Sequence, residues 1–472
     1  MISTHESLEI PGHPNTKSRN THIFLYFTAI TADLLLVSFG SGLAWTSPVL
    51  PKLHSNDSTI NPLGQPITTM QTALIAFIPL SAGSLTHLFW AILLDKIGRK
   101  LTMIIIATNA SCGLLGIAFA SNIYLYYICL CIFGCSLSGD VVAVVVYNNE
   151  IADDINRGRL GCLAALSVPS GMLFSYIFGS VTSFKVFTLI CAGPSFLFLL
   201  ASPFLVDCPT FLITKHKRFE AYRALKKLRV TEFQESLIWE YEKIKNTVIE
   251  GRTVRGNKYC TRAFIRAILQ SLLSLFVQQL SGILVVNYYV ASIFNESGFG
   301  LSGDCLGILV GVVQIVTYII ILILIQRIGK RRLILVSSLF CSISMFFLGL
   351  YFYLSHIKSP IFDRIHWIAI VFVIFYLISY GMGLGAIPMG LVGEFFCENT
   401  RAIGSALVFT VSDSLMALIV FSFPIVSETY GIYINFWFHC IGSLVGCVGL
   451  FFFFVETEGK SLLEVQNIMK NN

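Results

Sequence analysis

Long apolar runs separated by short polar turns fill the sequence from residue 23 to residue 454. A helix that crosses a membrane needs about 20 consecutive, mostly apolar residues. Runs of this kind cover residues 23–46, 71–94, 101–120, 123–147, 160–180, 186–206, 264–295, 304–326, 333–354, 365–393, 402–424 and 432–454. The pattern therefore predicts an all-α membrane protein with twelve transmembrane helices.

The twelve runs form two sets of six, with one long hydrophilic stretch between them. We expect five parts: a cytosolic N-terminal tail (1–22), an N-terminal six-helix half (23–206), a cytosolic helical linker (207–260), a C-terminal six-helix half (261–454) and a cytosolic C-terminal tail (455–472). Residues 1–22 are polar and the first apolar run is too long for the apolar core of a signal peptide, so no cleavable signal is expected.

Composition supports a membrane protein and excludes several other classes. The 472 residues are 55% hydrophobic and 12% charged, with a mean hydropathy of +0.76, whereas soluble domains are roughly 25% charged. The net charge of +6 comes without an aromatic-interleaved basic patch, so no nucleic-acid partner is expected. We find no nucleophile, base and orienter constellation, no metal-ligand spacing and no nucleotide-binding loop, which argues against an enzyme and against a metal or other cofactor.

The positions of the basic residues predict the orientation in the membrane. If both termini are cytosolic, all but four of the 32 lysines and arginines fall on the cytosolic side, as the positive-inside rule requires. The four exceptions are Lys52, Lys185, Lys358 and Arg364. The sequence thus predicts a multi-pass protein with both termini in the cytosol, and we expect the plasma membrane.

Two N-x-S/T sequons fall on or beside outer loops in this orientation, at Asn56 and Asn295, and both are candidate glycosylation sites. A third, at Asn109, lies within an apolar run and should be unused. The thirteen cysteines contain no C-x-x-C pair, and only Cys305 lies near the outer face, so no structural disulfide is implied.

The stretch Gln278–Phe294, with the sequence Q-Q-L-S-G-I-L-V-V-N-Y-Y-V-A-S-I-F, carries the main candidate binding residues. Hydrocarbon offers two adjacent glutamine amides no hydrogen bonds, so Gln278 and Gln279 should face a ligand or water, or join neighbouring helices. Ser281-Gly282 permits a local break or a close helix contact. Polar and aromatic groups follow at Asn287, Tyr288 and Tyr289. This combination is typical of a cavity for a polyol.

Charged motifs recur in the two halves. The hairpin Asp95–Lys100 is echoed by Gln326–Arg331, and an acid stands seven residues before an arginine at Glu150 and Arg157 and again at Glu394 and Arg401. A single cluster of this kind is most simply a solvated loop. Because the clusters occur at matched positions, we interpret them as paired switches in a transporter built from two six-helix halves.

These motifs together resemble the sugar porter family of the major facilitator superfamily over nearly the whole chain. The resemblance is carried by Asp95-Lys96-Ile97-Gly98-Arg99-Lys100, by Glu150 with Arg157-Gly158, by Asp207-Cys208-Pro209, by Gln278–Ile283, by Glu394 with Arg401, and by Glu456–Ser461. The segment Trp45–Leu53 further resembles the insect facilitated trehalose and glucose transporters.

The resemblance implies two sets of functional residues. The substrate-binding candidates are Gln278, Gln279, Gln314, Asn287, Tyr288, Tyr289, Met389 and Ser412, with Tyr380 as a further aromatic. The gating candidates, which should form ion pairs at the cytosolic side, are Arg99, Glu150, Arg157, Arg331, Glu394 and Arg401.

Several family sugar contacts are replaced in this sequence. Ala165 and Leu284 stand where the family has a glutamine and an asparagine, and Met389 and Ser412 stand where it has a tryptophan and an asparagine. The identity of the substrate is therefore left open.

Three acids lie within apolar runs that contain no obvious lysine or arginine partner: Asp33, Asp140 and Asp413. One of them could carry a proton, although the family's proton-carrying position is Gly42 here. His87 and His439 are expected to be hydrogen-bonded core groups.

The sequence thus predicts transport of a small sugar, a hexose or a disaccharide such as trehalose, by alternating access and as a uniport. The alternatives are a non-transporting sugar sensor, a proton-coupled carrier and a carrier of a non-sugar polyol. Sensors are marked by long tails, whereas seventeen residues follow Val455. The expected partners are the sugar and the lipid bilayer, and the protein is expected to be a monomer.

Overall fold

The computed structural model describes residues 23–153, 156–229, 234–253, 261–295, 303–360, 366–396 and 398–456, and all regular structure in these ranges is helical. The first half contains α1 (Ile23–Leu53), α2 (Thr69–Ile97), α3 (Arg99–Phe119), α4 (Ile123–Ile151), α5 (Arg157–Val181), α6 (Phe184–Cys191), α7 (Gly193–Ala201) and the 3₁₀ turn η1 (Ser202–Phe204). The linker contains α8 (Pro209–Thr214), α9 (Arg218–Leu228) and α10 (Gln234–Thr253). The second half contains α11 (Arg262–Leu280), α12 (Ile283–Asn295), α13 (Gly303–Ile328), α14 (Lys330–His356), α15 (His366–Met382), α16 (Ile387–Phe395), α17 (Glu398–Tyr430) and α18 (Ile432–Phe453).

The predicted twelve-span fold is confirmed. Within the described ranges, 11 helical segments are long and apolar enough to cross a membrane, and α13 contributes the shorter apolar segment Cys305–Ile321. Three of the predicted spans are each divided into two helices, namely α6 and α7, α11 and α12, and α15 and α16. Ala192, between α6 and α7, keeps a helical backbone conformation, so that division is slight. Non-helical backbone inside a membrane is tolerated only where protein or a water-filled cavity surrounds it, which makes the two breaks in the second half candidate sites.

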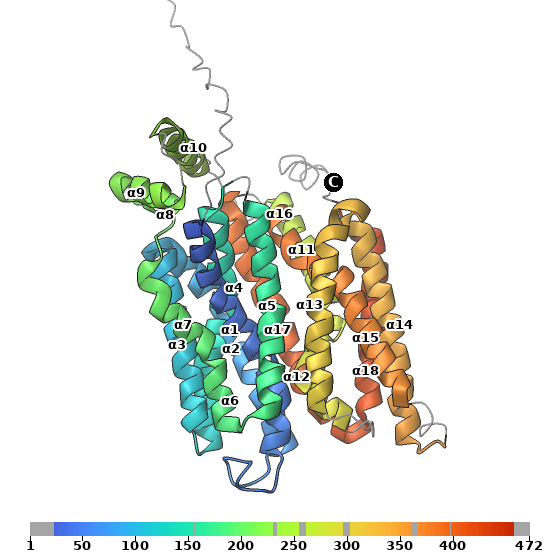
Figure 1. The fold of residues 1–472 in the computed structure, drawn as a ribbon. Coiled ribbons are helices and arrows are strands. Elements are labelled where there is room, and N and C mark those ends of the chain that lie inside the picture. Colours follow the sequence, from blue (N-terminus) through green and yellow to red (C-terminus); the bar gives the residue numbers. More distant parts are fainter. Residues whose placement is uncertain are drawn as a thin grey trace, which may run out of the picture.

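The two halves stand side by side, and α8–α10 sit at one end of the bundle (Figure 1). We call this end the linker end, and we call the end that carries residues 54–68 the opposite end. Among the described residues, the halves are joined chiefly by three helix pairs: α2 packs against α17, α5 against α13 and α1 against α12.

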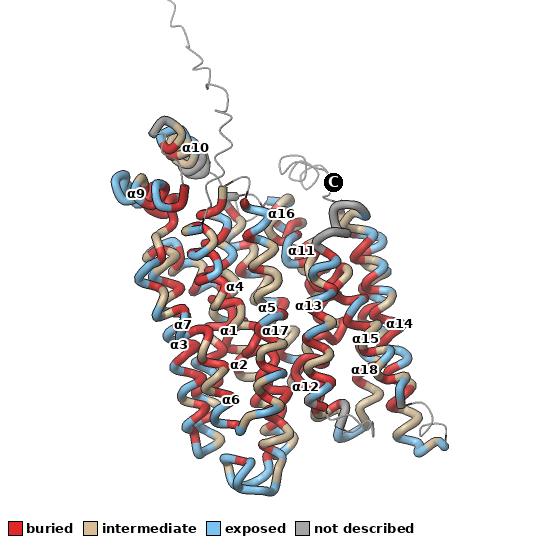
Figure 2. Tube along the Cα trace, in the orientation of Figure 1, coloured by how far each residue is buried: buried red, intermediate tan, exposed pale blue. Residues whose placement is uncertain are grey.

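Large apolar side chains cover the outside of the bundle. Leu85 on α2 is 76% exposed and Phe452 on α18 is 70% exposed. Figure 2 shows exposed residues along the outer faces of the helices and buried residues between them. An apolar exterior of this extent is suited to hydrocarbon and would be unfavourable in water.

The close packing of α1 on α5 depends on two glycines. A Cβ atom at Gly40 would lie 2.0 Å from the carbonyl oxygen of Val168, and one at Gly171 would lie 2.1 Å from that of Val37. The backbones therefore approach to a distance that no side chain would allow, as small residues in membrane helices permit.

The linker is fixed to the first half through Arg229. Its guanidinium donates to the carbonyl oxygen of Ile151 at the end of α4, at 2.8 Å, and forms an ion pair with Glu240 at 2.7 Å. The side chain of Arg229 is 8% exposed, so this contact is better shielded than an ordinary surface ion pair.

Candidate substrate site and charge clusters

The break between α11 and α12 falls at Ser281-Gly282, where the sequence permits one. Gly282 has a φ of +88°, in the left-handed region that favours glycine. The carbonyl groups left without helical partners are satisfied by side chains. The carbonyl of Leu280 accepts from His439 Nδ1 at 2.9 Å, and that of Ser281 accepts from the Tyr376 hydroxyl at 3.0 Å. His439 is thus a hydrogen-bonded core group, as expected.

A second break, between α15 and α16, lies beside the first. Gln278 Nε2 donates to the carbonyl oxygen of Leu384, in the turn between α15 and α16, at 2.7 Å and lies 3.1 Å from the Tyr380 hydroxyl. The Tyr318 hydroxyl donates to the carbonyl of Gly385 at 3.2 Å. Two interrupted helices therefore face each other, with an amide and two phenols between them.

Gln278 keeps one unused hydrogen-bonding atom. The residue is 3% exposed, and its Oε1 is buried without a hydrogen-bond partner among the described residues. An unsatisfied buried acceptor costs about 1–3 kcal/mol. Such a group is a position at which a ligand hydroxyl or a water molecule could donate a hydrogen bond.

Four other candidates form two hydrogen-bonded pairs. Gln279 Nε2 donates to Ser412 Oγ at 3.2 Å, joining α11 to α17. Gln314 Nε2 donates to Asn287 Oδ1 at 2.9 Å, joining α13 to α12. All four side chains are buried. The structure therefore brings Gln279 together with Ser412, and Gln314 together with Asn287, within the second half.

The remaining candidates differ in their surroundings. The Tyr289 hydroxyl donates to the carbonyl of Val420 at 3.1 Å, and its ring stacks on Phe423 with centroids 4.7 Å apart. Tyr288 is buried. Met389 on α16 is 47% exposed. Tyr289 thus packs within the second half, whereas the side chain of Met389 is partly accessible.

At the opposite end, the first half closes on α12. The Thr46 hydroxyl donates to the carbonyl of Tyr288 at 3.3 Å, and Ser47 Oγ accepts from the backbone N–H of Ala291 at 3.2 Å. The Tyr176 hydroxyl on α5 donates to the carbonyl of Asn287 at 3.0 Å. These contacts join the halves directly beside the candidate substrate residues.

At the linker end, the described ion pairs of the gating candidates lie within each half. Arg99 pairs with Glu150 at 2.7 Å and with Asp95 at 3.4 Å. Glu394 pairs with Lys330, which the sequence did not single out. The neighbouring Arg331 instead donates to the carbonyl of Phe451 at the end of α18, at 2.7 Å.

Arg331 is among the gating candidates, but the basic residue that meets Glu394 is its neighbour Lys330. Lys330 begins α14, and successive residues of a helix point about 100° apart, so Lys330 and Arg331 leave the helix in different directions. The repeated hairpin motif indicated that basic residues lie near Glu394. The packing of α14 on its neighbours determines which of them faces α16.

The two gating arginines at helix starts have different environments. Arg157 is exposed at the first turn of α5. Arg401 is partly buried, and its Nε has no hydrogen-bond partner in the described part of the chain.

Asp207 lies outside the membrane spans, at the start of the linker. Burial raises the pKa of its carboxyl group, and the nearby Lys100 and Lys217 partly offset this rise.

The two glycosylation candidates are placed differently. Asn56 is exposed in the loop between α1 and α2. The next residue, Asp57, accepts hydrogen bonds from the backbone and side chain of Thr59, which lower the pKa of its carboxyl group. Asn295 ends α12, and its side chain and the rest of its sequon lie outside the described residues.

The intramembrane acids also have distinct surroundings. Asp33 Oδ1 accepts from Asn148 at 2.8 Å. Both carboxyl oxygens of Asp140 are buried without a partner among the described residues. Asp413 Oδ2 lies 2.8 Å from His87 Nε2 of the other half, a partner that the residues of its own span could not reveal.

A bundle of two six-helix halves, with interrupted helices that bring amides together inside it, is the architecture of a secondary transporter. The sequence profile of the sugar (and other) transporter family matches residues 28–469. The chain belongs to this family, and it is a multi-pass membrane transporter rather than an enzyme.

Among its relatives, the facilitated trehalose transporter Tret1 of Apis mellifera ligustica is 26% identical over 458 residues, which cover 95% of this chain and 88% of the relative. The solute carrier family 2, facilitated glucose transporter member 6 of Mus musculus is 25% identical over 485 residues, covering 97% and 94%.

Solved structures of the xylose transporter XylE from E. coli share the fold. Its inward open conformation has a TM-score of 0.77 at 18% identity and covers 94% of this chain and 99% of that one. Its partially occluded inward open conformation has a TM-score of 0.75 at 20% identity, covering 93% and 100%. This similarity shows the major facilitator fold.

Proposed function

We propose that this protein carries a small sugar, a hexose or a disaccharide such as trehalose, across the plasma membrane by facilitative uniport and alternating access. The observation that carries the proposal is the buried, unpartnered Oε1 of Gln278 between two interrupted helices. A sugar hydroxyl is a donor that could satisfy it, and the nearby amides of Gln279 and Gln314 could serve further hydroxyls.

Aromatic residues support the same substrate class. Tyr380 lies against Gln278, and Tyr288 is buried on α12. Such rings can pack on the apolar face of a sugar while the amides bind its hydroxyls. The names of the relatives, which include trehalose and glucose transporters, point in the same direction.

We infer that the linker end faces the cytosol, because the excess of lysine and arginine lies there. The candidate site would then be closed toward the outside by the contacts of α1 and α5 with α12. In the outward-facing state, the acids and arginines of the linker end would pair across the halves and hold the inner gate shut. We also propose that the protein works as a monomer.

Tracer uptake into proteoliposomes with a panel of hexoses, disaccharides and polyols tests this proposal. We expect saturable uptake of at least one sugar, and uptake that an imposed pH gradient does not drive. Accumulation driven by the gradient would identify a proton-coupled carrier. Uptake of polyols without sugars would identify a polyol carrier, and binding without uptake would identify a sensor.

A further inference from the structure

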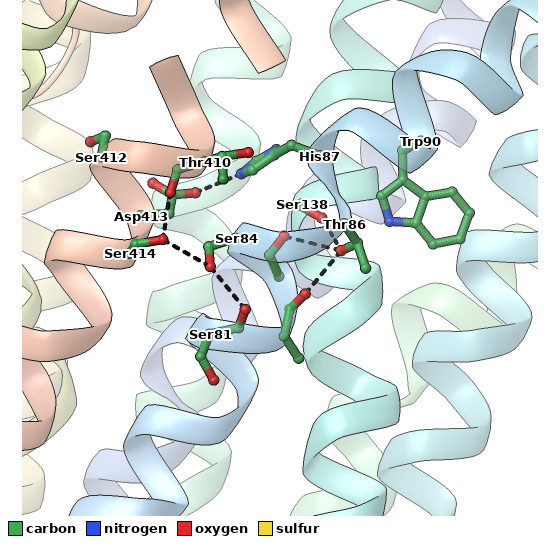
Figure 3. A network of polar contacts seen from close by, with 12 residues as sticks. Ser81, Ser84, Thr86, His87, Trp90, Ser138, Thr410, Ser412, Asp413 and Ser414 are labelled. Atoms are coloured by element: carbon green, nitrogen blue, oxygen red, sulfur yellow. Dashed lines mark hydrogen bonds and ion pairs between the residues drawn. The ribbon is translucent and has the colours of Figure 1, made fainter. Parts of the chain in front are cut away.

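A polar network crosses the interface between the halves where α2 packs on α17. His87 Nε2 lies 2.8 Å from Asp413 Oδ2, and the two residues are 326 positions apart in the chain. Three residues away on α2, Ser84 Oγ accepts from Ser414 Oγ at 3.3 Å. Figure 3 shows the His87 ring directed at Asp413 and the line of hydroxyls below it. Polar contacts thus join α2 to α17 inside the bundle.

The same short segment of α17 reaches the candidate substrate site. Ser412, directly before Asp413, accepts the hydrogen bond from Gln279 on α11. Residues 412–414 therefore contact α11 in their own half and α2 in the other half. A change at Gln279 can reach the interface through one rigid helical turn.

The contact between His87 and Asp413 is not expected to contribute much to the stability of the fold. The side chains are 5% and 26% exposed, and His87 Nδ1 is buried without a partner among the described residues. Buried charged or polar pairs often contribute no more stability than apolar residues of similar volume. Within a membrane, such groups are costly and usually functional.

We infer that His87 and Asp413 are positioning residues that couple sugar occupancy to the movement of one half against the other. This inference rests on the proposed function. When a sugar hydroxyl engages Gln279, Ser412 loses its donor and the turn carrying Asp413 is released to adjust against His87. Occupancy then changes the relative free energies of the two orientations of the carrier, as coupling between sites requires.

The test compares two rates in proteoliposomes at saturating sugar: equilibrium exchange, in which only the loaded carrier reorients, and zero-trans uptake, in which the empty carrier must return. D-glucose and trehalose serve as the probes. We expect the ratio of the exchange rate to the zero-trans uptake rate to be above one for the parent and close to one for His87→Ala. A purely structural defect lowers both rates by the same factor and leaves the ratio unchanged.

Two further variants sharpen the test. Ser84→Ala removes the uncharged contact on the same pair of helices and should keep the parent's ratio. The reversed pair, His87→Asp with Asp413→His, should restore a ratio above one. A parent ratio of one, or a His87→Ala ratio equal to the parent's, overturns the coupling role while leaving sugar transport intact. A parent that transports no sugar overturns the proposed function, and the coupling role with it.

Discussion

At the scale of single residues, the central feature is the half-satisfied amide of Gln278. Its nitrogen is occupied by the carbonyl of Leu384, whereas its oxygen has no partner among the described residues. The amide nitrogen therefore fixes the orientation of the side chain, and the amide oxygen remains able to accept a hydrogen bond from a ligand. The amide nitrogen of Gln279 is likewise occupied, because it donates to Ser412 Oγ.

Replacing Gln278 and Gln279 together by alanine should weaken sugar affinity by at least about 5- to 150-fold, since the loss of even one buried amide that binds the ligand costs about 1–3 kcal/mol. The concentration dependence of tracer uptake measures this effect. Gln270→Ala is the matched control, because Gln270 lies on the same helix but donates to Phe453 at the end of α18. If the double variant reaches the membrane and keeps the parent's affinity, the glutamines only join helices.

Asn56 should carry an N-linked glycan when the protein is expressed in insect or mammalian cells. The residue is exposed in the loop at the end of the bundle that we assign to the outside. Treatment with a glycosidase should increase the protein's mobility on a gel, and Asn56→Gln should remove the shift. Asn109→Gln should leave it in place, since Asn109 lies in α3 and donates to the carbonyl of Ile132. An unshifted parent would contradict the glycosylation assignment.

At the scale of elements, the two facing breaks organise the second half. Interruption of α11 and α12 frees carbonyls that His439 and Tyr376 satisfy, and interruption of α15 and α16 frees a carbonyl that Gln278 satisfies. Each break is thus stabilised by a side chain from another helix. Such breaks place polar backbone inside the membrane without leaving it exposed to lipid.

Gly282→Ala should destabilise the protein and slow transport. Its left-handed φ of +88° costs a residue with a Cβ about 1–2 kcal/mol, and that Cβ would lie 2.7 Å from the His439 ring. Thermal unfolding of the purified protein should show a lowered midpoint. Gly390→Ala is the control, because an added Cβ there lies in open space within α16 and alanine favours a helix. An equal midpoint for both variants would show that the break tolerates a side chain.

At the scale of the whole molecule, the two halves meet chiefly along three helix pairs in the described part of the chain, and their interface is closed at one end. The contacts of Thr46 and Tyr176 with α12 lie at the opposite end, whereas the ion pairs of Arg99 and Lys330 lie inside each half at the linker end. Alternating access requires these two sets of contacts to form in turn. Exposed ion pairs contribute about 0–1 kcal/mol each, whereas these pairs are partly buried, and a network between two bistable halves can shift their equilibrium.

Glu394→Gln should therefore slow net transport and favour the state open at the linker end, and Glu150→Gln should act likewise. A cysteine at Gly393, where an added side chain lies in open space, should react faster with a membrane-impermeant thiol reagent applied from the linker end. Glu242→Gln is the control, because Glu242 forms an exposed pair with Lys245 on α10. Normal expression with the parent's labelling and rate would mean that the ion pairs of both acids have no part in gating.

The sequence by itself determined the twelve spans, because lipid forces the backbone into helices whose length and apolar character are local properties of the chain. It also located the break at Ser281-Gly282, since glycine can adopt the left-handed conformation. It identified Gln278 and Gln279 as residues that need partners within the membrane.

Only the tertiary structure decided who those partners are. Lys330 rather than Arg331 meets Glu394, and His87 meets Asp413 across 326 positions of the chain. The break between α15 and α16 likewise depends on distant residues, because Gln278 and Ser337 bind the backbone of Leu384 in the turn. The hydrophobic pattern of the sequence indicates which residues are buried or face lipid. Which polar groups face one another depends on the rotation and packing of helices that are distant in the chain.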